Sequence, residues 1–247
     1  MLATDDVARL RTTRVRRPIL VWTMTTPSSL PEEDYIKRRY RRWRNLVVPF
    51  AYKQTKSVRL AQILDETGGL TSTALELGVG PGGIAGPISR RGIRIVGIDL
   101  SREALDRAKQ YCLNDDVVLL CGSGFALPFK DASFPLVYAS QVLHLFDDEG
   151  RLRLMFEVKR VLRPGARFVF DLKNVGSHPI RYWRSSVERR RRNFPTSRQI
   201  QALLSRAGFT DVDTRPGVMP GLGAIQVPNA GVFRAVAHTR FFIARKL

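Results

Sequence analysis

The sequence predicts an α/β protein built on a doubly wound, mostly parallel seven-stranded sheet in three layers, with helices ahead of it. Two observations lead to this prediction. Short apolar runs alternate with segments of helical periodicity from about residue 72 onward, and glycine, acidic or serine residues follow where several of these runs end. Strands that alternate with helices at this spacing form parallel sheets. Ligands then bind outside the carboxyl ends of the strands.

Seven apolar runs are the expected strands. They cover residues 73–77, 93–98, 117–121, 136–139 and 167–172, a sixth run near Val212 and a seventh over 233–242. Segments with helical periodicity cover residues 84–91, 102–112, 149–162 and 197–207. Arg163-Pro164-Gly165 has the composition of a turn.

The segment ahead of the first strand is expected to be helical. Apolar and aromatic residues between 35 and 47 recur at three- and four-residue steps among lysines and arginines. Pro49 should interrupt this helix, which restarts at 58–64. We expect a disordered extension over 1–31, a helical, basic segment on the substrate side over 32–70, and one domain over 71–247 with a basic insertion at 173–196.

The formal net charge of +19 is unevenly distributed. Residues 24–60 carry +6 and residues 172–206 carry +8, whereas residues 61–171 carry −1. This pattern indicates a neutral core with basic attachments that could meet an anionic partner. Biased base composition is the alternative, because 33 of the 41 basic residues are arginine.

Composition also indicates a cellular setting. The two cysteines, Cys112 and Cys121, exclude a disulfide scaffold and favour a reducing, cytoplasmic location. The first 23 residues lack the apolar region of a secretory signal, and are either an extension or the result of a wrongly chosen start codon. No apolar run approaches the roughly 18 residues of a membrane span. No cluster has metal-ligand spacing, so we expect no metal.

A glycine-rich turn, Gly78-Val79-Gly80-Pro81-Gly82-Gly83, directly follows the first strand. Glycines allow positive φ and let the backbone approach a ligand without Cβ atoms in the way. The turn alone is ambiguous. It fits the cofactor turn of a methyltransferase. It fits the dinucleotide fingerprint of a nicotinamide enzyme as well, with Asp99 at about the offset of a ribose-binding acid.

Three further features separate a nicotinamide enzyme from a methyltransferase. Glu76 lies inside the first strand, where a buried carboxylate needs a partner. An ammonium group could be that partner, whereas a pyrophosphate would be repelled. Asp99 precedes a helix and could accept both ribose hydroxyls. The fourth strand is preceded by Leu127-Pro128-Phe129 and followed by Ser140-Gln141-Val142-Leu143-His144.

This set resembles the class I S-adenosylmethionine-dependent methyltransferases, which have a Rossmann-like fold. It is most similar to the small-molecule branch that includes the ubiquinone and menaquinone biosynthesis enzymes. The resemblance covers residues 72–172 well and residues 196–215 less specifically. It implies S-adenosylmethionine as cofactor. The residues that it implies around the methionine moiety, the ribose, the adenine and the methyl end are Glu76, Gly78, Gly80, Gly82, Asp99, Leu100, Gly122, Ser123, Gly124, Phe125, Ser140 and Leu143.

The sequence departs from the family pattern at two positions. The acid that commonly binds the adenine amino group is replaced by Ser123, so we expect weaker adenine recognition. The usual Phe-Asp ahead of the fourth strand is Phe134-Pro135, which should alter how that strand begins rather than abolish catalysis.

Methyl transfer is an in-line displacement that depends chiefly on alignment. His144 is the candidate general base for a phenol or quinol acceptor, the alternative being that it caps or packs the next helix. Acceptor selection is assigned to the basic segments, and the substrate-side residues are Tyr40, Trp43, Tyr182, Trp183 and Arg184.

The predicted acceptor is a small hydrophobic or lipid-like molecule, with peripheral contact to an anionic membrane. Nucleic acid is a less favoured partner, because the segment after the fourth strand lacks the Asn/Asp-Pro-Pro-Tyr/Phe tetrapeptide of enzymes that methylate base amines. Two alternatives stay open: an RNA-modifying methyltransferase that uses the arginine-rich segments, and a non-catalytic scaffold with a cofactor fold. The sequence gives no oligomeric state.

Overall fold

The computed structural model describes residues 22–23, 50–66, 71–113, 115–174, 195–217, 237 and 239–247, with side chains from residue 55 onward. Its helices are α3 (Phe50–Glu66), α4 (Ala85–Ser89), α5 (Arg102–Tyr111), the short 3-10 helix η1 (Leu143–Leu145), α6 (Asp148–Val161) and α9 (Ser197–Arg206). Its strands are β1 (Trp22–Thr23), β2 (Thr73–Leu77), β3 (Arg94–Asp99), β4 (Val117–Cys121), β5 (Phe134–Ser140), β6 (Leu162–Lys173), β7 (Phe209–Pro216) and β8 (Thr239–Lys246).

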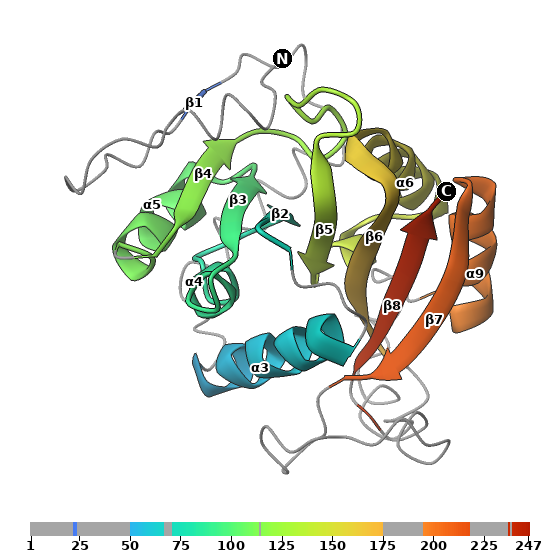
Figure 1. The fold of residues 1–247 in the computed structure, drawn as a ribbon, viewed down its shortest axis with the longest axis horizontal. Coiled ribbons are helices and arrows are strands. Elements are labelled where there is room, and N and C mark those ends of the chain that lie inside the picture. Colours follow the sequence, from blue (N-terminus) through green and yellow to red (C-terminus); the bar gives the residue numbers. More distant parts are fainter. Residues whose placement is uncertain are drawn as a thin grey trace, which may run out of the picture.

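The strands form one sheet in the order β1-β4-β3-β2-β5-β6-β8-β7. Neighbouring strands from β1 to β6 run parallel, and β8 lies antiparallel between β6 and β7 (Figure 1). This confirms the doubly wound, mostly parallel fold. All seven expected strands are present, and the two-residue β1 adds an unexpected eighth beside β4. Strand order reverses at β2, where β3 lies on one side and β5 on the other.

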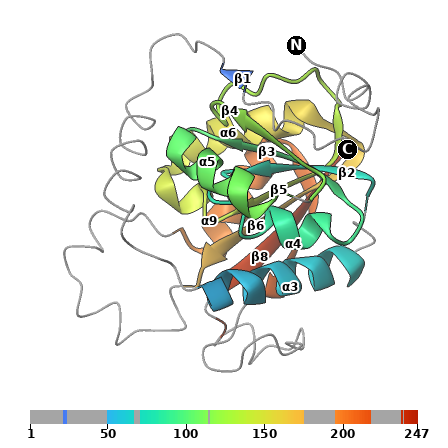
Figure 2. The same cartoon turned by 90° about the vertical axis from the view of Figure 1, so that its left-hand side faces the viewer.

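Two apolar clusters cover the two faces of the sheet. One contains side chains of α6 and α9, and the other contains side chains of α3, α4 and α5. Figure 2 shows α3, α4 and α5 in front of the sheet, with α6 and α9 behind it. The strand residues alternate between the clusters, as Leu75 and Ala74 do, because successive side chains of a strand point to opposite faces.

Three predicted boundaries are corrected. The helix expected to restart at residue 58 begins earlier: α3 starts at Phe50, directly after Pro49. Proline is tolerated next to the first turn of a helix. Strand β6 begins at Leu162, so the expected turn at 163–165 lies within it. The β5–β6 register shifts between Phe134 and Leu136, and Gly165 has a φ of +74°. The final strand begins at Thr239; residues 233–236 lie outside the described part.

Helices α5, α6 and α9 begin at residues whose side chains cap them. Ser101 accepts a hydrogen bond from the backbone N–H of Ala104, and Asp147 accepts one from Gly150. Thr196 and Gln199 form a reciprocal capping box ahead of α9. Within the described ranges, none of the helices is both long and apolar enough to cross a bilayer. The predicted domain limits at 31/32 and the basic insertion fall largely outside these ranges.

Candidate cofactor and methyl-transfer site

The glycine turn connects β2 to α4 at the point where strand order reverses. Gly78, Gly80 and Gly82 all have positive φ, of +66°, +53° and +79°. The backbone N–H of Gly78 donates to the Ile98 carbonyl over 2.8 Å, which ties the turn to the end of β3. A Cβ on Gly82 would lie 2.7 Å from Sγ of Cys112, the C-cap of α5, so this glycine also permits close packing against that helix.

Asp99 ends β3 and is 5% exposed. Its two carboxylate oxygens accept hydrogen bonds from the backbone N–H groups of Gly80 (2.8 Å) and Ser101 (2.9 Å). Burial raises the pKa of Asp99, and the backbone hydrogen bonds oppose that rise. Ser101, not Asp99, caps α5. Because each carboxylate oxygen has two lone pairs, Asp99 can still accept from two further hydroxyl groups.

Glu76 is 2% exposed and accepts a hydrogen bond from the Tyr138 hydroxyl over 2.8 Å. These two residues are direct neighbours in the β2–β5 register. Burial and the adjacent Glu76 carboxylate raise the pKa of Tyr138 well above its usual value, so its hydroxyl remains a donor. The sequence signal for Glu76 did not include this partner, because the pairing of the two strands is a tertiary feature.

The loop after β4 carries the four residues predicted to border the adenine. Ser123 is buried, and its hydroxyl oxygen accepts from the backbone N–H of Phe125 over 3.1 Å. The hydroxyl hydrogen therefore remains for another acceptor. Gly122 donates to the Asp99 carbonyl, and a Cβ on Gly124 would lie 2.8 Å from the Leu154 side chain. Leu100 and Phe125 are partly buried against the apolar core.

The post-β5 turn, residues 140–143, lies over the glycine turn. A Cβ added to Gly78 would come within 2.5 Å of Val142 Cγ2, so the two turns are in direct contact. Gln141 has a φ of +60°, which is uncommon for a residue other than glycine. Leu143 is fully buried at the start of η1. The structure thus brings Ser140 and Leu143 to the strand ends that carry Glu76 and Gly78.

Two buried charged groups hold the post-β5 turn. Arg151, the largest fully buried side chain among the described residues, donates from Nε to the Leu143 carbonyl over 3.0 Å. Burial lowers the pKa of Arg151, while Asp148 opposes that shift. Asp171 accepts from the backbone N–H of Gln141 over 2.9 Å and from its side chain over 3.1 Å.

Asp171 also forms a buried ion pair with Lys56 of α3. Burial would raise the pKa of Asp171, but Lys56 and the hydrogen bonds from Ser140 and Gln141 lower it below its usual value. Sequence reasoning missed this pair because Lys56 stands in a basic segment expected to face a substrate. Arg59 is similarly buried, and its Nε donates to the Pro216 carbonyl.

His144 lies in η1, half-buried, one residue after Leu143. The structure therefore places it at the same edge of the sheet as the candidate cofactor residues, and its role as a base stays a prediction. The substrate-side residues Tyr40, Trp43, Tyr182, Trp183 and Arg184 lie outside the described residues. In the described part, no group of three or more His, Cys, Asp or Glu side chains could hold a metal ion.

These residues fit S-adenosylmethionine in chemical character. Glu76 offers a carboxylate for an ammonium group, and Asp99 has lone pairs for ribose hydroxyls. The glycine turn next to them lacks Cβ atoms at Gly78 and Gly80, so a ligand can approach its backbone closely. Of the two cofactors that the glycine turn alone allowed, the site favours the one that carries an amino-acid group.

Comparisons with known proteins give the family of the chain. The model of the methyltransferase domain family matches residues 75–170, from β2 to β6. An uncharacterised methyltransferase from Synechocystis sp. is 30% identical over 168 residues, which cover 66% of this chain and 76% of that protein. Norajmaline N-methyltransferase from Rauvolfia serpentina is 33% identical over 120 residues, 46% of this chain and 40% of that protein.

Solved structures of methyltransferases have the same fold. The crystal structure of a SAM-dependent methyltransferase from Thermotoga maritima has a TM-score of 0.65 at 19% identity, covering 87% of this chain and 97% of that chain. The family match and the relative from Synechocystis show that the chain belongs to the S-adenosylmethionine-dependent methyltransferases of class I, and S-adenosylmethionine is its cofactor. The chain spans less than half the length of the first curated relatives that it matches.

Proposed function

We propose that this methyltransferase acts on a small hydrophobic or lipid-like acceptor, such as a quinol, at an anionic membrane surface. Glu76, Gly78 and Gly80 would hold the methionine moiety, Asp99 the ribose, and Ser123 with its neighbours the adenine. The sulfonium methyl of the bound cofactor is already activated for displacement. The protein's task is then to hold the acceptor in line with it.

The post-β5 turn carries the proposal for the acceptor. Its neighbour at the glycine turn is the apolar, partly exposed Val142, and the segment lacks the Asn/Asp-Pro-Pro-Tyr/Phe tetrapeptide of enzymes that methylate base amines. An apolar side chain at this place suits a carbon or phenolic acceptor better than a base amine. The relative from Rauvolfia serpentina, which by its name methylates norajmaline, supports a small organic acceptor.

The uneven charge supports the membrane half of the proposal. Residues 24–60 and 172–206 carry +14 between them, whereas residues 61–171 are close to neutral. Near an anionic surface each lysine or arginine contributes about 1 kcal/mol of attraction. Lys56 and Arg59 are buried, so they do not add to this attraction. The same charge would attract RNA, which is the reason to test both.

An acceptor panel tests the chemistry. We expect methyl transfer from labelled S-adenosylmethionine to at least one quinol, phenol or small amine, and no transfer to tRNA or rRNA. His144→Ala should reduce turnover at neutral pH with a quinol or phenol, whose hydroxyl group must lose a proton. Labelling of RNA without labelling of any small molecule would overturn the proposal.

Vesicle sedimentation tests the location. The protein should sediment with vesicles containing phosphatidylserine at low salt and be released as salt rises, because screening shortens the range of the attraction. Vesicles of phosphatidylcholine alone are the matched control. Equal recovery with both vesicles at low salt would remove the membrane from the proposal.

A further inference from the structure

Lys56 and Asp171 are a buried ion pair whose side chains are 3% and 0% exposed. They are 115 residues apart in the sequence and join α3 to the carboxyl end of β6. Taking two charges out of water is costly, and apolar residues of similar volume are often at least as stabilising. Stability alone is therefore a poor reason for this pair.

Asp171 makes contacts that connect the pair to the post-β5 turn. Its carboxylate accepts from the backbone N–H of Gln141 and from the Gln141 side-chain amide. Gln141 has the left-handed backbone conformation, which costs a residue other than glycine free energy. Two hydrogen bonds from one residue to one carboxylate favour this conformation over the extended one. Asp171 is thus the acceptor that compensates for the strain.

Lys56 determines where that acceptor lies and keeps it charged. A fully buried aspartate without a cation would become neutral or move toward water. Either change would weaken the hydrogen bonds to Gln141. The next residue, Val142, lies against Gly78. A shift of Gln141 would therefore also move Val142 relative to the glycine turn.

We infer that Lys56 is a positioning residue for methyl transfer. It holds Asp171, Asp171 holds Gln141 in its left-handed conformation, and Gln141 sets the turn that covers the methionine end of the cofactor site. The inference rests on the proposed cofactor site, because the turn matters only if the methionine moiety lies at Gly78.

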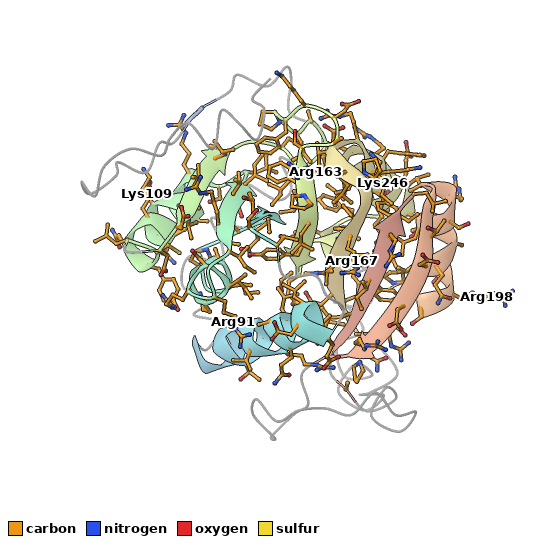
Figure 3. All side chains as sticks on the ribbon, viewed as in Figure 1. Arg91, Lys109, Arg163, Arg167, Arg198 and Lys246 are labelled. Carbon is orange, nitrogen blue, oxygen red and sulfur yellow. The ribbon has the colours of Figure 1, made fainter. Side chains whose placement is uncertain are left out.

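Calorimetry with two ligands separates positioning from general damage. S-adenosylhomocysteine carries the amino-acid part, whereas 5′-methylthioadenosine lacks it. In Lys56→Met, the dissociation constant for S-adenosylhomocysteine should rise at least about tenfold, equivalent to roughly 1.4 kcal/mol. The constant for 5′-methylthioadenosine should stay within about twofold. Lys109→Met on α5, at an exposed pair with Asp106, is the matched control and should change neither constant (Figure 3).

A second substitution tests the route through Gln141. Glycine adopts positive φ readily, so Gln141→Gly should need less help from Asp171. The double variant Lys56→Met/Gln141→Gly should recover at least about threefold of the affinity for S-adenosylhomocysteine that Lys56→Met loses. A residue that merely supports the fold would show no such rescue, and absence of rescue would overturn the route.

Asp171→Asn keeps the shape of the side chain and replaces Lys56→Met in the calorimetry if Lys56→Met does not fold. It should show the same selective loss for S-adenosylhomocysteine. Equal losses for both ligands, or no loss for either, would overturn the inference while leaving the cofactor site intact. Wild-type protein that binds 5′-methylthioadenosine and S-adenosylhomocysteine equally well would instead overturn the proposed methionine site.

Discussion

Three carboxylates are buried at the carboxyl ends of the strands, and each has a different kind of partner. Backbone N–H groups hold Asp99, a phenol holds Glu76, and an ammonium group with an amide holds Asp171. Asp171 accepts from so many groups that little capacity remains for a ligand. Each carboxylate oxygen of Asp99 accepts one of these backbone hydrogen bonds and has a second lone pair. We therefore propose that Asp99 and Glu76 contact the cofactor, whereas Asp171 has a structural role.

Asp99→Ala should weaken S-adenosylmethionine binding at least about tenfold, which corresponds to losing roughly 1.4 kcal/mol of hydrogen bonding to the ribose. Isothermal titration calorimetry measures this directly. Asp106→Ala, an exposed aspartate of the following helix, is the control and should bind normally. A dissociation constant that does not change in Asp99→Ala would contradict the ribose assignment.

Asp171 also predicts a pH dependence of stability. Its folded-state pKa lies below the ordinary value of 3.8, so its contribution is fully present above that value and is lost as pH falls through the lower folded-state pKa. Asp171→Asn should therefore be less stable than wild type by about 3 kcal/mol near neutral pH, and the difference should shrink below about pH 4. Urea denaturation across this range gives the difference, and a gap that grows in acid would contradict the sign.

At the scale of elements, the site depends on two turns packed against each other. The glycine turn provides backbone without Cβ atoms, and the post-β5 turn provides Val142 as its cover. Two constraints favour glycine at position 78: its φ is positive, and a Cβ there would clash with Val142. Gly92 also has positive φ, of +85°, but a Cβ there would meet nothing within 4 Å.

Gly78→Ala and Gly92→Ala should therefore behave differently. Both introduce a side chain in the left-handed region, at a cost of about 1 kcal/mol in the free energy of unfolding. Only Gly78→Ala also forces the two turns apart, so it should additionally weaken cofactor binding. Thermal denaturation and calorimetry on both variants check this. Normal cofactor affinity in Gly78→Ala would show that the turns need not touch.

At the scale of the whole molecule, the candidate site bridges the two halves of the sheet. Asp99 comes from the half containing β3 and β4, whereas Ser140 and Leu143 follow β5 in the other half. A ligand that contacts both halves and binds only the folded state stabilises it by linkage. At one hundred times its dissociation constant, the gain is about 2.7 kcal/mol.

S-adenosylhomocysteine at that concentration should raise the melting temperature by about 5–10 °C for a protein of this size. Differential scanning calorimetry measures the shift. In Asp99→Ala the same ligand concentration should give a smaller shift, because saturation is lower. A single transition that does not move in the wild-type protein would argue against the site.

Much of this architecture could be predicted from the sequence because its signals are local. Strand β4 has the predicted bounds, and the glycine turn falls where strand order reverses. The partners of Glu76 and Asp171 could not be predicted in this way. Tyr138 resembles an ordinary core tyrosine, and Lys56 resembles one more cation in a basic stretch. Their roles depend on strand register and on a contact across 115 residues.

The position of β8 has a consequence for how the protein is made. Although β8 is synthesised after β6 and β7, it lies between them (Figure 1). During translation, the edge of β6 that includes Asp171 therefore stays unpaired until β8 has been made. Asp171 then pairs in register with Phe241. Unpaired strand edges favour association with other chains. A nascent chain that ends before β8 therefore exposes an edge of β6 that β8 covers in the complete sheet.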